Sequence, residues 1–235
     1  MTNNINNIYI ELSNTKHLLV AGATGSGKSS TIDGIMYAIL HKNPAPIVFL
    51  IDPKQIDLLK YSNLTITAKY ADTPAGALEV LQTASCMMRN RFTELKQFNG
   101  LKSKSDRPPV YIVFDEFTDY TGKQYDKQAD IIAHQIEREL IHISALGRAA
   151  NIHLIIATQT VLARLIPTEL TNNCSVLALH CRTESQSRVL IGERGAESLP
   201  EHGFGLINYG DCLQRAKLPL IPQSALLQAI DYWQK

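Results

Sequence analysis

Short apolar runs alternate along this chain with longer segments in which apolar residues recur every three or four positions. The runs occupy positions 17–21, 47–51, 110–114, 152–157 and 176–180. A strand that is covered by helices on both faces of a parallel sheet shows a run of this kind. We therefore expect buried strands at these positions, a further strand at 203–207, and a weakly alternating strand at 8–12 on the edge of the sheet.

The segments between these runs have the spacing of amphipathic helices. At 30–40, for example, Ile32, Ile35, Met36 and Ile39 fall on one side of a helix. The same spacing predicts helices at 73–99, 128–149, 184–191 and 223–232. Strands that alternate with helices form a parallel sheet. The pattern thus predicts an α/β fold with a mainly parallel sheet flanked by helices on both faces, in a single domain over 1–235 whose residues 1–15 form an edge strand and a lead-in segment.

Composition fits one sizeable core and gives no bias towards a polyanionic partner. The chain has 235 residues, 45% of them hydrophobic, and 23 Lys and Arg balance 22 Asp and Glu to a net charge of +1. A surface for nucleic acid must therefore be a local patch. No apolar run approaches the roughly 20 residues that span a bilayer, and the polar, uncharged N-terminus differs from a signal peptide. These features predict a cytoplasmic protein without membrane insertion.

The four cysteines show no C-x-x-C pair and no zinc spacing. In a protein without a secretory signal, we expect them to be reduced thiols in the core. They are Cys86, Cys174, Cys181 and Cys212.

A glycine-rich segment between the first buried strand and the first helix carries the strongest chemical signal. It matches the phosphate-loop pattern of two glycines, a lysine and a hydroxyl residue position for position. Backbone N–H groups of such a loop, together with the helix N-terminus, cradle a triphosphate; the lysine reaches its outer phosphates and the hydroxyl binds Mg²⁺. Glycine-rich turns without nucleotide exist, but Lys-Ser at this offset argues against one. The predicted ATP-binding residues are Gly22, Ala23, Thr24, Gly25, Ser26, Gly27, Lys28, Ser29 and Ser30.

Polar side chains follow three of the expected strands, at the sheet edge where ligands bind in α/β folds. Asp115 and Glu116 follow the strand at 110–114. In a phosphate-loop protein we expect Asp115, with Ser29, to hold Mg²⁺ and Glu116 to polarise the attacking water. Gln159 follows the strand at 152–157 and is a candidate sensor of the γ-phosphate or the lytic water. Asp52-Pro53-Lys54 ends the strand at 47–51.

Two polar connections on either side of the strand at 110–114 carry candidate DNA contacts. The segment 100–109 contains Lys102, Lys104 and Arg107, and the segment 122–127 contains Lys123 and Lys127. We expect them to line a central channel and hold DNA by its backbone, although a solvated turn is the simpler interpretation of so short a charge run.

Taken together, these residues resemble the motor domain of the FtsK/SpoIIIE family of ring-forming, ATP-driven DNA translocases. The resemblance runs from the phosphate loop through Asp52-Pro53-Lys54 and the segment 113–117. It is most specific at 147–154 with Ala157-Thr158-Gln159, and it continues through 187–190 and 195–199. We expect this chain to carry neither the membrane spans nor the winged-helix module of chromosome-segregating members. Thr160-Val161 stands where many members have Arg-Pro.

The resemblance implies a RecA-like P-loop NTPase fold and a stand-alone motor of a mobile element. It further implies a hexameric ring that hydrolyses ATP with Mg²⁺ at subunit interfaces, moves DNA, and is recruited by a partner protein of a transfer or replication apparatus. Arg188, in the segment that faces the neighbouring subunit in the family, is our first candidate for an arginine finger, with Arg148 and Arg182 next. Two alternatives stay open: an ATPase that powers protein export, and a nucleotide-dependent switch that binds a partner.

Overall fold

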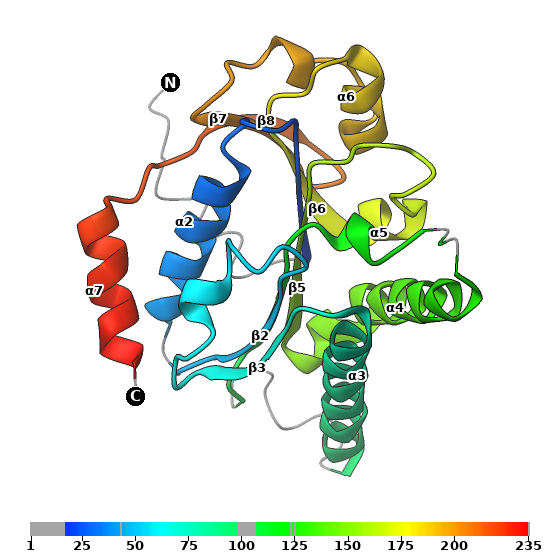
Figure 1. The fold of residues 1–235 in the computed structure, drawn as a ribbon, viewed down its shortest axis with the longest axis vertical. Helices are drawn as coiled ribbons and strands as arrows, with labels where there is room; N and C mark the ends of the chain where they lie inside the picture. The colour runs from blue at the N-terminus through cyan, green and yellow to red at the C-terminus, as the bar shows by residue number, and fades with distance from the viewer. Residues whose placement is uncertain (1–16, 43, 98–106, 123, 125, 235) are drawn as a thin grey trace.

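The computed structural model describes residues 17–42, 44–97, 107–122, 124 and 126–234 (Figure 1). The edge strand expected at 8–12 lies outside this range. The strands are β1 (His17–Ala21), β2 (Ile47–Ile51), β3 (Thr67–Ala71), β4 (Val110–Phe114), β5 (Ile152–Thr158), β6 (Cys174–Ala178), β7 (Phe204–Asn208) and β8 (Leu213–Lys217). The α-helices are α2 (Lys28–Leu40), α3 (Pro74–Gln97), α4 (Lys127–Leu146), α5 (Thr168–Asn173), α6 (Glu184–Ile191) and α7 (Gln223–Trp233). Short 3₁₀ turns are η1 (Leu59–Tyr61), η3 (Phe117–Asp119), η4 (Gly147–Ala150) and η5 (Ala196–Ser198).

The eight strands of the described residues form one sheet, in the order β3-β2-β4-β5-β1-β6-β7-β8. Neighbouring strands from β3 to β6 in this order are parallel. Strand β7 is antiparallel to both of its neighbours, β6 and β8. The order places β1 in the middle, with β5 and β4 beside it on one side. The carboxyl ends of β1, β4 and β5 therefore meet at one edge of the sheet, as the prediction of a mainly parallel α/β sheet requires.

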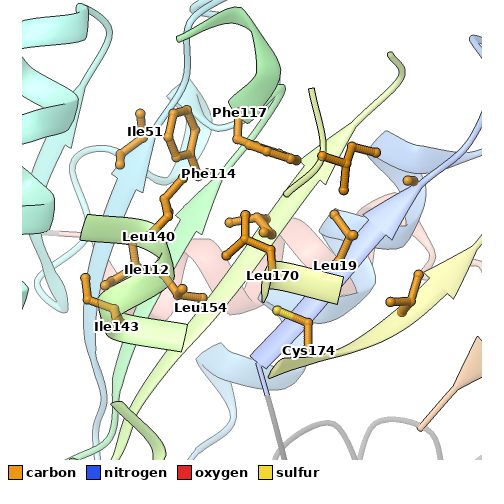
Figure 2. Close-up of a cluster of buried hydrophobic side chains, with 14 of the residues drawn as sticks. Leu19, Ile51, Ile112, Phe114, Phe117, Leu140, Ile143, Leu154, Leu170 and Cys174 are labelled. Atoms are coloured by element: carbon orange, nitrogen blue, oxygen red, sulfur yellow. The ribbon is translucent and has the colours of Figure 1, made fainter. Parts of the chain in front are cut away.

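Helices cover both faces of the sheet, and alternate side chains of each central strand enter different cores. On β1, Leu19 packs with residues of α3, α4 and α5, whereas Leu18 and Val20 pack with α2 and α7. Figure 2 shows the first core, in which Leu19 lies with Leu140 of α4 and Leu170 of α5. Because both faces are buried, the strands need apolar residues at every position, which is why they appear as uninterrupted runs in the sequence.

Three elements do not follow from the sequence pattern. β3 and β8 carry Lys69, Arg215 and Lys217 among few apolar residues, because both strands lie at the edges of the sheet. The six-residue helix α5 is too short to show a helical period. The long helix expected at 128–149 ends at Leu146, and the chain then tightens into η4.

The expectation that all four cysteines lie in the core is wrong for two of them. Cys174 and Cys181 are buried, but Cys86 and Cys212 are exposed, and all four are free thiols. Cys86 lies on the outer side of α3, and Cys212 lies in the β7–β8 turn, so neither position faces a neighbouring layer. Among the described residues, no helix is both long and apolar enough to cross a membrane.

Candidate active site

The glycine-rich segment forms a tight loop between β1 and α2. Ser26 N donates to Ala23 O at 3.0 Å, and Gly27 precedes the helix with φ of 89°. Gly25 also has a positive φ, of 85°. Only glycine adopts such a backbone conformation without strain. The sequence thus builds a loop that follows the carboxyl end of β1 and leads directly into the N-terminus of α2 (Figure 1), the arrangement that binds phosphate groups in such proteins.

A side chain at the first glycine would fill the space beneath this loop. A Cβ added to Gly22 would lie 2.7 Å from Leu179 Cβ and 2.8 Å from Ser26 Oγ. The side chains of Thr24, Ser29 and Ser30 are exposed, whereas Ser26 is buried. The loop therefore packs directly on the residues that follow β6 while its outer side stays open, which suits a triphosphate cradled by backbone N–H groups.

Lys28, the first residue of α2, forms a buried ion pair with Asp115, directly after β4. The sheet order explains the contact, because only β5 separates β4 from β1. Asp115 Oδ2 is buried and has no hydrogen-bond partner among the described residues. Burial raises the pKa of the Asp115 carboxyl, and the nearby charge of Lys28 opposes that shift. A buried carboxylate oxygen without a partner among the described residues, on the residue that pairs with the neighbour of the exposed Ser29, fits the oxygen ligands that Mg²⁺ prefers.

Glu116 lies beside this pair, with its carboxylate held by several donors. Its Oε1 accepts hydrogen bonds from Thr158 Oγ1 at 2.7 Å, Gln159 N at 2.8 Å and Thr118 Oγ1 at 3.3 Å. Its Oε2 accepts from Lys54 Nζ at 3.2 Å. Its φ of 46° lies in the left-handed region, which non-glycine residues rarely adopt outside functional sites. The backbone thus turns sharply after Asp115, and the two adjacent carboxylates contact different partners.

The pKa of the Glu116 carboxyl is lowered despite its burial. Burial alone acts to raise it, but the hydrogen bonds from Thr158 and Gln159 N and the charges of Lys54 and Lys28 outweigh that effect. Glu116 is therefore ionised at neutral pH, as a residue that accepts a proton from water must be.

Gln159 links the strand end to the phosphate loop. Its Oε1 accepts a hydrogen bond of 2.9 Å from Thr24 Oγ1, and its backbone N–H donates to Glu116. One residue thus touches both the loop expected to hold the phosphates and the carboxylate expected to activate water. Such a position suits the sensor role suggested by the sequence.

Arg188 stands apart from this cluster. It lies on α6, exposes 57% of its side chain and pairs with Glu184 one turn earlier at 2.7 Å. Among the described residues its polar contact is with Glu184, on its own helix. It does not complete the site within one subunit.

The described residues of the two segments expected to line a DNA channel, 107–109 and 122, 124 and 126–127, lie at opposite ends of β4. Arg107 precedes the strand, where it pairs with Glu94 at 2.8 Å and donates to Arg91 O at 3.2 Å. It is bound to α3 rather than presented to solvent as a free cation. Lys127 begins α4 beyond the other end of the strand and is exposed. Lys102, Lys104 and Lys123 lie outside the described residues.

Lys54 and Thr158 were not assigned roles from the sequence, yet both contact Glu116. The signal that could have identified them is their position in the sequence, because Lys54 follows β2 and Thr158 ends β5. Both strands pair with β4, so both residues reach the same edge of the sheet as Glu116. The order of strands in the sheet, which the sequence pattern does not supply, is needed to see this.

A family model described as the FtsK/SpoIIIE family matches residues 3–106. A protein named DNA translocase FtsK from Treponema pallidum is 32% identical over 214 residues, which cover 83% of this chain and 25% of that protein. A second protein of that name, from Tropheryma whipplei, is 30% identical over 251 residues, covering 96% and 32%. The chain belongs to the FtsK/SpoIIIE family. It spans about a quarter to a third of the length of these FtsK relatives.

Solved structures share the fold of this FtsK/SpoIIIE chain. The pCW3 conjugation coupling protein TcpA, a monomer with ATPγS, superposes with a TM-score of 0.80 at 21% identity, covering 94% of this chain and 66% of that one. The cytoplasmic domain of the type VII secretion ATPase EccC from Thermomonospora curvata gives 0.69 at 21% identity, covering 93% and 28%. At such identities the likeness concerns the P-loop ATPase fold.

Proposed function

We propose that this chain is the motor of an ATP-driven DNA translocase, which hydrolyses ATP with Mg²⁺ in the cytoplasm. The observation that carries the proposal is the convergence of Lys28, Asp115 and Glu116 beside an open glycine loop. The ATPase class rests on family membership, and the DNA substrate rests on the names of the relatives.

In this proposal each residue has one task. Lys28 would leave Asp115 and bind phosphate oxygens, and Asp115 would then hold Mg²⁺ together with Ser29. Bound Mg²⁺ supplies positive charge that offsets the charge developing on the phosphate oxygens. Glu116 accepts the proton of the attacking water. Gln159 senses the bound phosphates through its hydrogen bond with Thr24 of the phosphate loop.

We further propose a hexameric ring in which Arg188 reaches the active site of the neighbouring subunit. Its exposure on α6 supports this role, and an arginine supplied in trans neutralises charge in many such motors. DNA would be held by its backbone through Lys102, Lys104, Lys123 and Lys127, with Arg107 bracing the first segment against α3. The likeness to a conjugation coupling protein supports a role in moving DNA of a mobile element, with a recruiting partner.

A second candidate is an ATPase that energises protein export. The fold likeness to a type VII secretion ATPase favours it, with a TM-score of 0.69. The geometry described above suits both functions, because its residues are those expected to bind and hydrolyse ATP.

ATPase activity measured with single-stranded DNA, with double-stranded DNA and without DNA distinguishes the DNA motor from the export ATPase. The motor proposal expects stimulation by DNA and binding that weakens steeply with salt, because phosphate contacts release counterions. The matched variant replaces Lys123 and Lys127 by Ala, and it is expected to lose stimulation while keeping turnover without DNA. An ATPase that ignores both kinds of DNA would favour the export function, and a chain that binds ATP without hydrolysing it would favour a switch.

A further inference from the structure

Both carboxylate oxygens of Glu116 are engaged by protein groups, yet they are held very differently. Oε1 is fixed by two hydroxyl groups and a backbone N–H. Oε2 has one partner among the described residues, Lys54 Nζ at 3.2 Å. A general base must turn one oxygen towards water. Oε2 is the oxygen that a single broken contact would free.

The two ends of the Lys54–Glu116 contact differ in burial. The Glu116 side chain is 2% exposed, whereas that of Lys54 is 38% exposed. An ammonium group in this position regains water when the contact opens, and the Glu116 charge keeps its donors at Oε1, so we expect opening to cost less than breaking a pair that is buried at both ends. Release therefore proceeds by movement of Lys54, while Glu116 stays anchored through Oε1.

The backbone beneath Lys54 is built as a tight turn held by Asp52. Gln55 N donates to Asp52 O at 3.1 Å, and Leu58 N donates to the buried Asp52 Oδ2 at 2.9 Å. Gln55 has a φ of 57°, a conformation that costs free energy in a non-glycine residue. The turn from Pro53 to Leu58 thus positions Lys54 beside the residues that follow β4, where its Nζ contacts Glu116.

We propose that Lys54 is a positioning residue that holds Oε2 of Glu116 in the nucleotide-free protein, and that hydrolysis requires release of this ion pair. Thr158 has the complementary role, because it anchors Oε1 when Oε2 turns to water. The proposal deepens the ATPase function proposed above and rests on it.

Steady-state kinetics of matched variants test this arrangement. Lys54→Met is expected to raise kcat without DNA about two- to fivefold, the scale of one partly exposed ion pair, with KM for ATP unchanged. Lys54→Arg retains the contact and should stay near the wild-type rate. Thr158→Val should lower kcat about tenfold or more, the scale expected for a misplaced base. Lys60→Met is the control, because Lys60 pairs with Asp33 in the same region and is exposed to a similar extent, at 40%.

A kcat that falls in Lys54→Met and returns in Lys54→Arg would overturn the proposal, since Lys54 would then support the base. Equal rates in Lys54→Met, Lys60→Met and wild type would overturn it as well. If none of these proteins hydrolyses ATP, the proposed ATPase function itself fails.

Amide exchange gives a readout that does not depend on turnover. In wild type, exchange at Gln55 and Leu58 is expected to accelerate when Mg²⁺ and a non-hydrolysable ATP analogue are added, because Lys54 lets go of Glu116. In Lys54→Met it should be fast from the start and rise no further. An analogue that binds without changing exchange in wild type would overturn the proposal independently of the kinetics.

Discussion

Two lysines each hold a carboxylate of the active site, and the pairs differ in what opening them costs. Lys28 and Asp115 are both buried, with side chains 3% and 1% exposed. Removing one member of such a pair leaves a charge without a partner in a region of low polarity. In the Lys54–Glu116 pair, by contrast, the lysine ammonium group returns to water when the ion pair breaks. The nucleotide-free site therefore has one contact whose release needs a replacement ligand and one that opens readily.

Lys28→Met tests the buried pair. We expect it to lower nucleotide affinity and also to reduce the free energy of unfolding by about 3 kcal/mol, because Asp115 loses its partner. Adding Asp115→Asn should recover part of the lost stability without restoring nucleotide binding. Urea unfolding of wild type, both single variants and the double variant measures the coupling. Equal stability of Lys28→Met and wild type would contradict a stabilising role for the pair.

Glu116→Gln tests the base. The amide keeps the size of the side chain but cannot accept a proton, so we expect ATP binding to persist and hydrolysis to slow at least ~10²-fold. Asp119→Asn is the matched control, because Asp119 is an exposed carboxylate three residues later. Single-turnover hydrolysis with equal protein and ATP would measure both. If Glu116→Gln hydrolyses ATP at the wild-type rate, another residue must act as the general base, and Asp115 would be the next candidate.

At the scale of elements, the joint between α4 and β5 depends on one close approach. A Cβ at Gly147 would lie 2.9 Å from Ile152 O, 3.1 Å from His17 Cε1 and 3.2 Å from Ile143 Cγ2. The first two of these belong to the adjacent strands β5 and β1. Glycine at the end of α4 therefore lets the helix pack directly against the central strands before the chain enters β5.

Gly147→Ala should lower the free energy of unfolding by about 1–3 kcal/mol, because a methyl group cannot fit without a backbone shift. Arg148→Ala, at the exposed neighbouring position, should change it by less than about 0.5 kcal/mol. Thermal and urea unfolding of the two variants provide the comparison. If Gly147→Ala is as stable as Arg148→Ala, the connection between α4 and β5 accommodates the added methyl group without loss of stability.

The sequence predicts the elements that are buried on both faces and misses those at the edges. β1, β2 and β4 have the expected bounds because every residue in them meets a helix layer. β3 and β8 pair on one side only, so their polar residues hide the strand pattern. The same limit applies to the site. The phosphate loop is local in sequence and was predicted, whereas the Lys54 contact joins residues 62 positions apart and depends on strand order.

At the scale of the whole molecule, the near-neutral charge allows DNA binding only if a few cations are brought together. A ring would do so, because copies of the same lysines converge on one axis and create a local field. The ring would also bring Arg188, exposed on α6, close to the next subunit. The proposed DNA channel and the proposed arginine finger would therefore both require assembly.

Subunit mixing tests the arginine finger. Arg188→Ala and Lys28→Ala should each be inactive, for different reasons: the first lacks the finger and the second cannot hold ATP. In a mixed ring, an intact nucleotide site on an Arg188→Ala subunit can lie beside a Lys28→Ala subunit that still carries Arg188. We therefore expect some ATPase activity to return on mixing, with a maximum at intermediate ratios. Arginine fingers typically contribute ~10³-fold or more, so even a small fraction of complete interfaces is measurable.

Glu184→Ala is the control for this experiment, because it removes the partner of Arg188 on α6 and leaves the arginine in place. If Arg188 matters only through that pair, Glu184→Ala should be as inactive as Arg188→Ala. If Arg188 acts across the interface, Glu184→Ala should remain active, since the guanidinium stays free to reach the neighbour. Absence of recovery at any mixing ratio would count against Arg188. Recovery with Arg148→Ala or Arg182→Ala in its place would assign the finger to that residue.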